Sequence, residues 1–252
     1  MSEAVEIKNL KKTFDNGKHF VLNGIDLSIP RGTITVIIGY SGTGKSVLLK
    51  HILGLLEPTL GSICVLDHYY EKMSGLEKAQ LRKKFGVLFQ HAALFDDMTA
   101  IENAMFPLIE HRKDLSRDQM KTIASQKLVD SGLDPRHFDK LPSEISGGMR
   151  KRVGLARALA LEPEILLYDE PTTGLDPILT EMVDNLIYET HHKQGDKATS
   201  IVISHDLSAA FRLADKIVML HEGKVLKSGT ADDFLNSDHE FIRLFVDKGM
   251  RR

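Results

Sequence analysis

The sequence predicts one α/β domain over residues 1–252, with an antiparallel N-terminal β-layer, a parallel-sheet core and an inserted helical subdomain. Two observations predict the core. RGTITVIIG is short, apolar and β-branched, and SVLLKHILGLL follows it with the apolar spacing of a helix. Later, the strand patterns EILLYDE and TSIVISH flank the helix pattern TEMVDNLIYETHHK, an order of elements that builds parallel sheets.

The N-terminal layer is predicted from alternating apolar residues. VEIKNL near Val5 and VLNGIDLSI near Val21 alternate as strands do, and the turn-forming DNGK lies between them. The first core strand and its helix are followed by three more predicted elements. These are the strand GSICVLD, the helix GLEKAQLRKKF and the strand GVLFQ. We expect the first two strands to pair antiparallel.

The middle of the chain, about residues 98–161, lacks strand patterns and predicts a helical subdomain. Its helices are expected to break near Pro107, Pro135 and Pro142. The core then resumes, and KIVMLHEGKVLKSG predicts a hairpin with a Glu-Gly turn.

The C-terminal tail, about residues 230–252, is predicted to form two short helices, near ADDFLNS and EFIRLFVDK. Phe241, Leu244 and Phe245 fall on one face of the second helix, whereas Lys248, Arg251 and Arg252 follow at its end. An amphipathic helix of this kind docks on its own domain, on a second copy of the chain, or on a membrane surface.

Composition excludes several classes of protein. The chain of 252 residues is long enough for one large core, and its net charge of −2 argues against nucleic acid as a partner. The single cysteine, Cys64, lies in the apolar run SICVL and predicts a buried, inert thiol. No apolar run approaches the roughly 18 residues of a membrane span, so the chain is expected to be cytoplasmic.

GYSGTGKS, residues 39–46, matches the phosphate-binding P-loop pattern and lies between an apolar strand and a helix. Its glycines let the backbone wrap phosphate oxygens, Lys45 supplies positive charge, and the Ser46 hydroxyl is a ligand for Mg²⁺. The alternative is a glycine-rich turn. The pattern predicts ATP or GTP binding, with contacts from Gly39, Tyr40, Ser41, Gly42, Thr43, Gly44, Lys45, Ser46 and Val47.

EILLYDE predicts a buried strand that ends in two carboxylates. Asp169 would face the metal ion and Glu170 would face an attacking water, an arrangement typical of nucleotide hydrolysis. The alternative is a strand that ends in solvated acids.

SEISGGMRKRVGLARALA, which begins at Ser143, places a serine and two glycines before a helix-forming run. Backbone N–H groups and the positive end of the helix dipole are free there to meet an anion. The chain therefore holds a second anion-seeking helix start.

These motifs, with Gln90 in GVLFQ, Asp176 in TGLD and His205 in VISHD, resemble in order and spacing the nucleotide-binding subunit of ABC transporters. The resemblance covers nearly the whole chain. It implies an ATPase of the P-loop fold in which two copies pack head to tail, with ATP and Mg²⁺ bound between them. The second helix start would then serve the ATP of the second copy.

The resemblance also implies roles for single residues. Phe14 would stack on adenine, although a core phenylalanine is the alternative. Gln90 would reach the metal and the lytic water, and His205 would hold the γ-phosphate. The catalytic set implied is Lys45, Gln90, Glu170 and His205, and the metal ligands implied are Ser46, Gln90 and Asp169.

The implied dimer contacts lie in two other motifs. Asp176 would organise the interface, and three residues would bind the γ-phosphate of the second copy: Ser146, Gly147 and Gly148. One residue departs from the family pattern, because Met149 stands where glutamine is usual and cannot donate a side-chain hydrogen bond.

Within the family, QHAALFDDMTAIENAMFPLIEH and PSEISGGMRKRVGLARAL resemble most the ATPase of MCE-linked, Mla-type phospholipid transporters. That resemblance implies permease subunits and an MCE-domain lipid-binding protein as partners, at the cytoplasmic face of the inner membrane. Phe95 and Met98, in the loop LFDDMT, are expected to form a socket for the permease or to fold into the core.

Other functions remain open at this point. The ATPase of an amino-acid importer, a metal importer or a lipoprotein-release system is the main alternative, because substrate choice lies in permease pockets outside this chain. A soluble ABC ATPase acting on DNA or ribosomes would carry a coiled-coil insertion or a second cassette. A P-loop kinase would have no use for ISGGM or His205.

Overall fold

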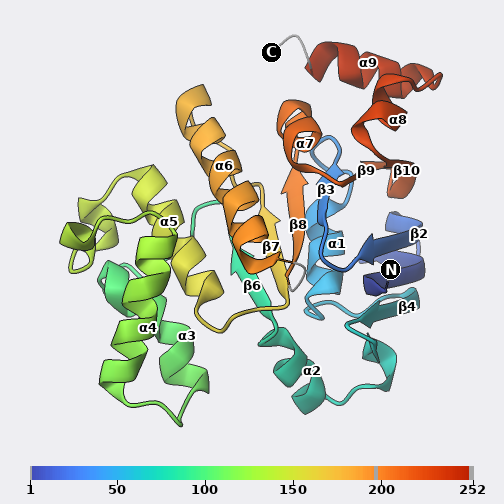
Figure 1. The fold of residues 1–252 in the computed structure, drawn as a ribbon. Coiled ribbons are helices and arrows are strands. Elements are labelled where there is room, and N and C mark those ends of the chain that lie inside the picture. The colour runs from blue at the N-terminus through green and yellow to red at the C-terminus, as the bar shows by residue number, and fades with distance from the viewer. Residues whose placement is uncertain (1, 196–197, 250–252) are drawn as a thin grey trace. The chain divides into compact units, whose positions relative to one another are not determined.

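The computed structural model describes residues 2–195 and 198–249, which form two compact units (Figure 1). Unit 1 takes Met1–Arg82 and Gly195–Arg252, and unit 2 takes Lys83–Gln194. Each unit carries part of the predicted nucleotide site.

An antiparallel sheet with the strand order β2-β1-β4-β5 occupies the N-terminal part of unit 1. Val5 lies opposite both Ile29 and Val65, and these three apolar side chains are buried on one face. The predicted antiparallel layer is confirmed. Its strands are β1 (Glu3–Thr13), β2 (Phe20–Pro30), β4 (Leu60–Val65) and β5 (His68–Tyr69).

Cys64 lies on β4 and is half-buried rather than buried. Burial raises the pKa of its thiol, which disfavours the reactive thiolate. This agrees with an inert cysteine.

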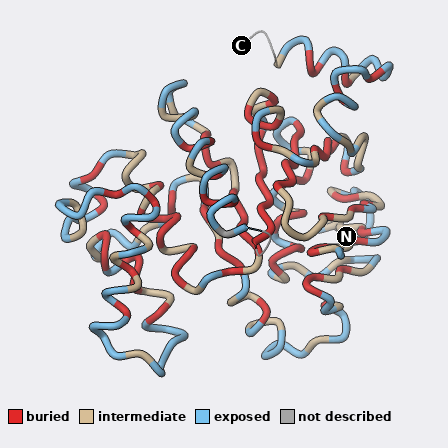
Figure 2. Tube along the Cα trace, in the orientation of Figure 1, coloured by how far each residue is buried: buried red, intermediate tan, exposed pale blue. Residues whose placement is uncertain are grey.

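The core strands of unit 1 lie in the order β10-β9-β3-β8. Every residue of β3 and β8 is buried, and Figure 2 shows both as continuous buried segments. β3 pairs in parallel with β8 and with β9, whereas β9 and β10 form the predicted hairpin through Glu222 and Gly223, both with positive φ. The strands are β3 (Ile34–Ile38), β8 (Thr199–Ser204), β9 (Lys216–His221) and β10 (Lys224–Gly229).

Three helices of unit 1 come directly after core strands in the sequence: α1 after β3, α7 after β8 and α8 after β10. Their bounds are α1 (Lys45–Ile52), α2 (Gly75–Arg82), α7 (Leu207–Leu213), α8 (Ala231–Leu235) and α9 (Glu240–Gly249), with a 3-10 turn at Tyr70–Lys72.

The tail helix α9 packs on α7 and α8 of its own unit. Its buried residues are Ile242, Phe245 and Val246, whereas Leu244 is 48% exposed. The predicted apolar face was therefore wrong at Leu244, because the helix is rotated towards Ile242 and Val246. Arg251 and Arg252 lie outside the described residues.

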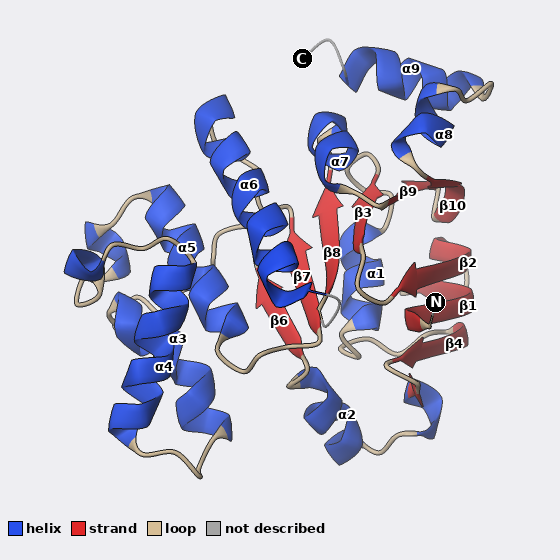
Figure 3. Ribbon diagram, viewed as in Figure 1, coloured by secondary structure: helices blue, strands red, loops and turns tan. Residues whose placement is uncertain are grey.

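Unit 2 combines a parallel strand pair with helices (Figure 3). Residues 98–161 contain helices and turns and no strand, as the sequence predicts. The elements are β6 (Phe85–Leu88), β7 (Ile165–Asp169), α3 (Ala100–His111), α4 (Arg117–Asp130), α5 (Gly147–Leu159) and α6 (Pro177–Gln194), with 3-10 turns at Pro135–His137 and Pro142–Glu144.

Pro107 does not mark a helix break, contrary to expectation, but lies inside α3. The helix continues through it because a capping box of Thr99 and Glu102 fixes its start and a buried face holds it in a core with α4 and α5. Packing of Ala104 and Leu108 therefore outweighs the loss of one backbone hydrogen bond.

Among the described residues, no helix combines the length and apolar character that crossing a membrane requires.

Gly86 on β6 allows close approach of α5, which generates a stability prediction. A Cβ atom there would lie 2.5 Å from the Ala158 carbonyl oxygen and 2.9 Å from a Leu166 methyl carbon. Overpacking of this kind costs about 1–3 kcal/mol, so Gly86→Ala should lower the free energy of unfolding by that amount in urea titrations. Gly75→Ala is the matched control, since a Cβ at Gly75 meets nothing within 4 Å. Equal stability of both variants would contradict the close approach.

Candidate nucleotide-binding site

The P-loop turn connects β3 to α1 in unit 1, as predicted. Gly44 stands at the N-terminus of α1 with φ 97°, and a Cβ atom there would lie 2.6 Å from a Leu22 methyl carbon and 3.0 Å from the Val21 carbonyl oxygen. Glycine is required at this position both for its conformation and for its contact with β2. The turn thus brings free backbone N–H groups to the start of a helix.

Lys45 bends back over the loop that precedes it. Its Nζ donates hydrogen bonds to the carbonyl oxygens of Gly39 (2.7 Å) and Tyr40 (3.1 Å), and the residue is 5% exposed. A buried ammonium held at the mouth of a turn rich in N–H donors is an arrangement that binds phosphate oxygens. The neighbouring Ser46 is exposed.

His205 lies beside the P-loop at the same edge of the sheet. Ile38 and Ser204 are register partners in the parallel pair β3–β8, and the next residues along the two strands are Gly39 and His205. Carboxyl ends of parallel strands meet at one edge, where ligands of such sheets bind. His205 is exposed there, and Asp206 caps α7 directly after it by accepting from the Ser208 N–H (2.8 Å).

Phe14 follows β1 and is 62% exposed, so it is not a core phenylalanine. Its ring centroid lies 5.2 Å from the Lys12 Nζ. Lys12 is the register partner of Leu22, the residue that Gly44 contacts. Phe14 therefore follows the strand pair β1–β2, and Leu22 of that pair packs against Gly44 of the P-loop.

In unit 2, β7 presents the two predicted carboxylates at its C-terminal end. The strand is buried up to Asp169, and both Asp169 and Glu170 are half-buried. Glu170 has φ 45°, in the left-handed region, and its carboxylate accepts a hydrogen bond from the Thr173 hydroxyl (3.0 Å). The chain thus turns sharply at Glu170 and fixes the direction of its side chain.

The segment Ser146–Gly148 begins α5, as the sequence predicts. Ser146 is the N-cap, and its hydroxyl accepts from the Met149 N–H (3.3 Å). Arg150 donates to the Ile145 carbonyl (2.9 Å) and so holds the residues ahead of the helix. Ser146 is exposed and the two glycines are half-buried, which leaves the helix start open to a ligand.

Two further residues have a visible local role. Met149 packs against the helical core of unit 2, so an apolar residue there contributes burial where a glutamine would donate a hydrogen bond. Asp176 accepts from the Leu179 N–H (3.0 Å) at the start of α6 and acts as a helix cap.

The loop after Gln90 is held by two cations of α5. Lys151 Nζ donates to the Gln90 carbonyl (2.6 Å) and to the Pro171 carbonyl, and so joins this loop to the segment after the paired carboxylates. Arg157 donates to the carbonyls of Ala92 and Ala93, at 2.7 Å each. Burial lowers the pKa of Lys151 to about 8 and also lowers the pKa of Arg157.

A buried amide fixes the next part of this loop. Asn103 on α3 accepts from the Phe95 N–H (2.9 Å) and donates to the carbonyls of Phe95, Met98 and Thr99 (3.0–3.1 Å). The residue is fully buried. Every polar atom of its side chain is thus used to hold the loop.

Phe95 remains 38% exposed, although its ring lies 4.5 Å from that of Phe106 and 5.7 Å from the Arg157 guanidinium. Met98 is half-buried. Phe95 is therefore not folded into the core, whereas the role of this loop as a socket for a permease stays a prediction.

Each unit gathers one part of the predicted set. Unit 1 holds the P-loop, His205 and Phe14, and unit 2 holds Gln90, the carboxylates of β7, Ser146 and Asp176. Sequence reasoning missed Asn103, Lys151 and Arg157. Lys151 and Arg157 lie in GGMRKRVGLARAL. A cation at an otherwise apolar position of this helix was the pattern that could have indicated them.

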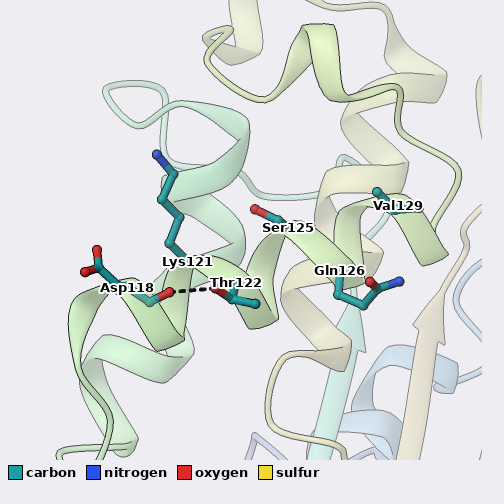
Figure 4. Close-up of a pocket in the computed structure, with 6 residues that line it drawn as sticks. All are labelled: Asp118, Lys121, Thr122, Ser125, Gln126 and Val129. Atoms are coloured by element: carbon teal, nitrogen blue, oxygen red, sulfur yellow. Dashed lines mark hydrogen bonds between the residues drawn. The ribbon is translucent and has the colours of Figure 1, made fainter.

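A hollow of about 500 Å³ lies on one face of α4 (Figure 4). All of its lining residues come from that helix and are mostly exposed, and none was predicted as a site residue. Thr122 donates to the Asp118 carbonyl (2.9 Å), an ordinary bond within a helix. The hollow is a solvated helix face.

The sequence model described as "ABC transporter" matches residues 22–173, from β2 to the turn after Glu170. The chain belongs to the ABC transporter family. As an ABC ATPase it hydrolyses ATP, and its fold is the α/β P-loop fold of these proteins, with an antiparallel N-terminal sheet.

Several relatives span nearly the whole chain. The probable ribonucleotide transport ATP-binding protein mkl of Mycobacterium leprae is 41% identical, over 98% of this chain and 69% of its own. The intermembrane phospholipid transport system ATP-binding protein MlaF of Haemophilus influenzae is 38% identical, over 92% and 86%. The methionine import ATP-binding protein MetN of Carboxydothermus hydrogenoformans is 38% identical, over 95% and 70%.

Among solved structures, a dimeric ATP-binding cassette in a post-hydrolysis state with ADP and Pi bound is similar to this ABC ATPase. Its TM-score is 0.80 at 32% identity, and the match covers 90% of this chain and 98% of the other.

The buried amine of Lys151 generates a prediction of pH dependence. Its pKa falls from 10.5 to about 8 on folding, so the unfolded chain binds more protons between these values. The unfolding free energy of the native chain, relative to the Lys151→Met variant, should therefore rise as the pH increases from about 8 to about 10. Urea unfolding of both chains at several pH values measures this difference. A constant difference would show that the Lys151 amine keeps its ordinary pKa.

Proposed function

We propose that this ABC ATPase powers a permease that moves phospholipid between bacterial membranes, as part of an Mla-type system with an MCE-domain protein. The observation that carries the ATPase mechanism is the pair of anion-binding helix starts, at Gly44 in unit 1 and at Ser146 in unit 2. The lipid assignment is supported by the 38% identity to MlaF, which is named for intermembrane phospholipid transport.

Two copies of the chain would bind two ATP molecules in a head-to-tail dimer. The P-loop of one copy would hold the phosphates, and Ser146, Gly147 and Gly148 of the second copy would contact the γ-phosphate. Phe14 would stack on the adenine, and Asp176 would order the interface beside its cap on α6. The similar cassette with ADP and Pi bound is a dimer, which supports a dimer of this chain.

The proposed chemistry needs mainly positioning and charge. Lys45, already held at the P-loop mouth, would exchange its two carbonyl acceptors for phosphate oxygens. Glu170 would accept a proton from the attacking water, with its carboxylate direction set by Thr173, and His205 would donate to the γ-phosphate.

Each unit supplies oxygen donors that suit a magnesium ion. A hydroxyl at the first turn of a P-loop helix and a carboxylate at a strand end are the oxygen donors that Mg²⁺ prefers, here Ser46 and Asp169, with Gln90 as a further ligand. When bound, Mg²⁺ would neutralise phosphate charge.

Coupling to the permease would use the loop of residues 90–98. Lys151, Arg157 and Asn103 hold this loop against unit 2 while Phe95 stays exposed. A loop held by hydrogen bonds that also exposes a phenylalanine ring can transmit a displacement between a partner and α5. We place the ATPase at the cytoplasmic face of the inner membrane through this contact.

The main rival is another transport substrate. MetN, named for methionine import, is as similar in identity as MlaF, and substrate choice lies in permease pockets. The deciding experiment is to tag the chain, extract it in mild detergent and identify co-purifying proteins by mass spectrometry. We expect a polytopic permease and an MCE-domain protein. A different permease would remove the lipid assignment and leave the ATPase mechanism.

The general-base role of Glu170 is tested by Glu170→Gln. Loss of a positioned base should lower steady-state ATP turnover by about 10²–10⁴-fold while ATP binding persists. Glu164→Gln is the matched control, because Glu164 lies just ahead of β7 in a surface ion pair with Lys84 (2.7 Å). Phosphate release and ATP binding are measured on the same preparations. Unchanged turnover in Glu170→Gln would remove Glu170 from this role.

A further inference from the structure

An aromatic cluster connects the P-loop to the C-terminal helix within unit 1. The Tyr40 ring lies edge-on to Phe245, with centroids 5.1 Å apart, and edge-on to Phe241, with centroids 6.0 Å apart. Both distances and both steep interplanar angles are those of favourable aromatic pairs. Phe245 is buried, so this contact is part of the packing of α9.

The backbone of Tyr40 is the point where this cluster meets the phosphate-binding turn. Its carbonyl oxygen accepts hydrogen bonds from the Lys45 Nζ (3.1 Å), the Thr43 hydroxyl (2.9 Å) and the Thr43 N–H (3.3 Å). The side chain and the carbonyl belong to one residue, so the position of the ring constrains the position of this oxygen. Tyr40 therefore links α9 to Lys45, because its ring contacts the helix and its carbonyl oxygen accepts from the Lys45 Nζ.

The same helix contacts two other segments at this edge of the sheet. The Phe241 ring lies 4.0 Å from that of His221, at the end of β9. The carbonyl of the preceding residue, Leu220, would be 2.6 Å from a Cβ at Gly39. At the other end of α9, a Cβ at Gly249 would lie 3.0 Å from a Leu207 methyl carbon, two residues after His205.

We propose that α9 is a positioning element for nucleotide binding, and that Phe245 and Phe241 hold Tyr40 so that the P-loop keeps its phosphate-binding shape. The inference rests on the proposed role of the P-loop. A glycine-rich turn gains affinity when packing restricts it to its bound shape, because less conformational entropy is lost on binding. Figure 1 shows α9 next to α8, which follows the β9–β10 hairpin.

The test measures the Kd of ADP with Mg²⁺ for the full-length chain. Phe245→Ala should weaken binding by about three- to tenfold, the range expected for loss of one aromatic pair. Leu244→Ala is the matched control on the same helix, since Leu244 is exposed, and its Kd should match the native value. A native Kd in Phe245→Ala would overturn the proposal.

A double-mutant cycle separates positioning from general stability. Tyr40→Ala and Phe245→Ala remove the same contact, so the double variant should bind ADP no more weakly than Tyr40→Ala alone. Additive losses would contradict the proposal. If Phe245→Ala fails to fold, Phe245→Leu keeps an apolar side chain but loses the ring, and it should weaken ADP binding with little change in its urea midpoint.

Lys45→Ala distinguishes this inference from the proposed site. Retained ADP affinity in Lys45→Ala would refute the P-loop as the nucleotide site and the inference with it. Lost affinity in Lys45→Ala together with native affinity in Phe245→Leu would overturn only the role of α9.

Discussion

The parallel pairing of β3 with both β8 and β9 is the constraint on which unit 1 depends. β3 is buried on both faces and ends at Ile38, opposite Ser204 on one side and Met219 on the other. The chain leaves the sheet at that edge, so the P-loop, His205 and the end of β9 lie near one another whatever their separation in sequence. A slip in this register would move His205 away from the loop.

Unit 2 is organised by α5, which serves two purposes at once. Its N-terminus at Ser146 is open to a ligand, whereas its next turns carry Lys151, Gly154 and Arg157 against the loop after Gln90. Gly154 allows a close approach, because a Cβ there would lie 2.9 Å from a Leu88 methyl carbon and 3.1 Å from the Ala92 Cβ. One helix therefore fixes both a binding surface and the neighbouring loop.

Most of the fold was predictable because its signals are local. Apolar runs predicted the core strands, and alternating apolar residues predicted the antiparallel layer. The glycines of GYSGTGKS, together with Lys45, predicted the phosphate-binding turn. The misses depend on packing between distant segments. Pro107 stays inside α3 because a core holds the helix, and Leu244 is exposed because α9 docks through Ile242 and Val246.

The same distinction applies to the site. P-loop geometry follows from the spacing of the motif, whereas the bonds of Asn103, Lys151 and Arg157 join residues that no short pattern connects. Whether a lysine in a helix faces solvent or a buried carbonyl is decided by the partner it meets. The resemblance to a family supplied the roles of Gln90 and His205, which physics alone would not have separated from ordinary residues.

Ala92 and Ala93 both adopt left-handed backbone conformations, with φ of 60° and 47°. Such conformations cost L-residues about 1–2 kcal/mol each, and here the two carbonyls are held by a guanidinium 64 and 65 residues further along the chain. The hydrogen bonds from Arg157 thus hold the loop in a backbone conformation that is costly for alanine. The conformation of the loop and the position of α5 are therefore coupled through these hydrogen bonds.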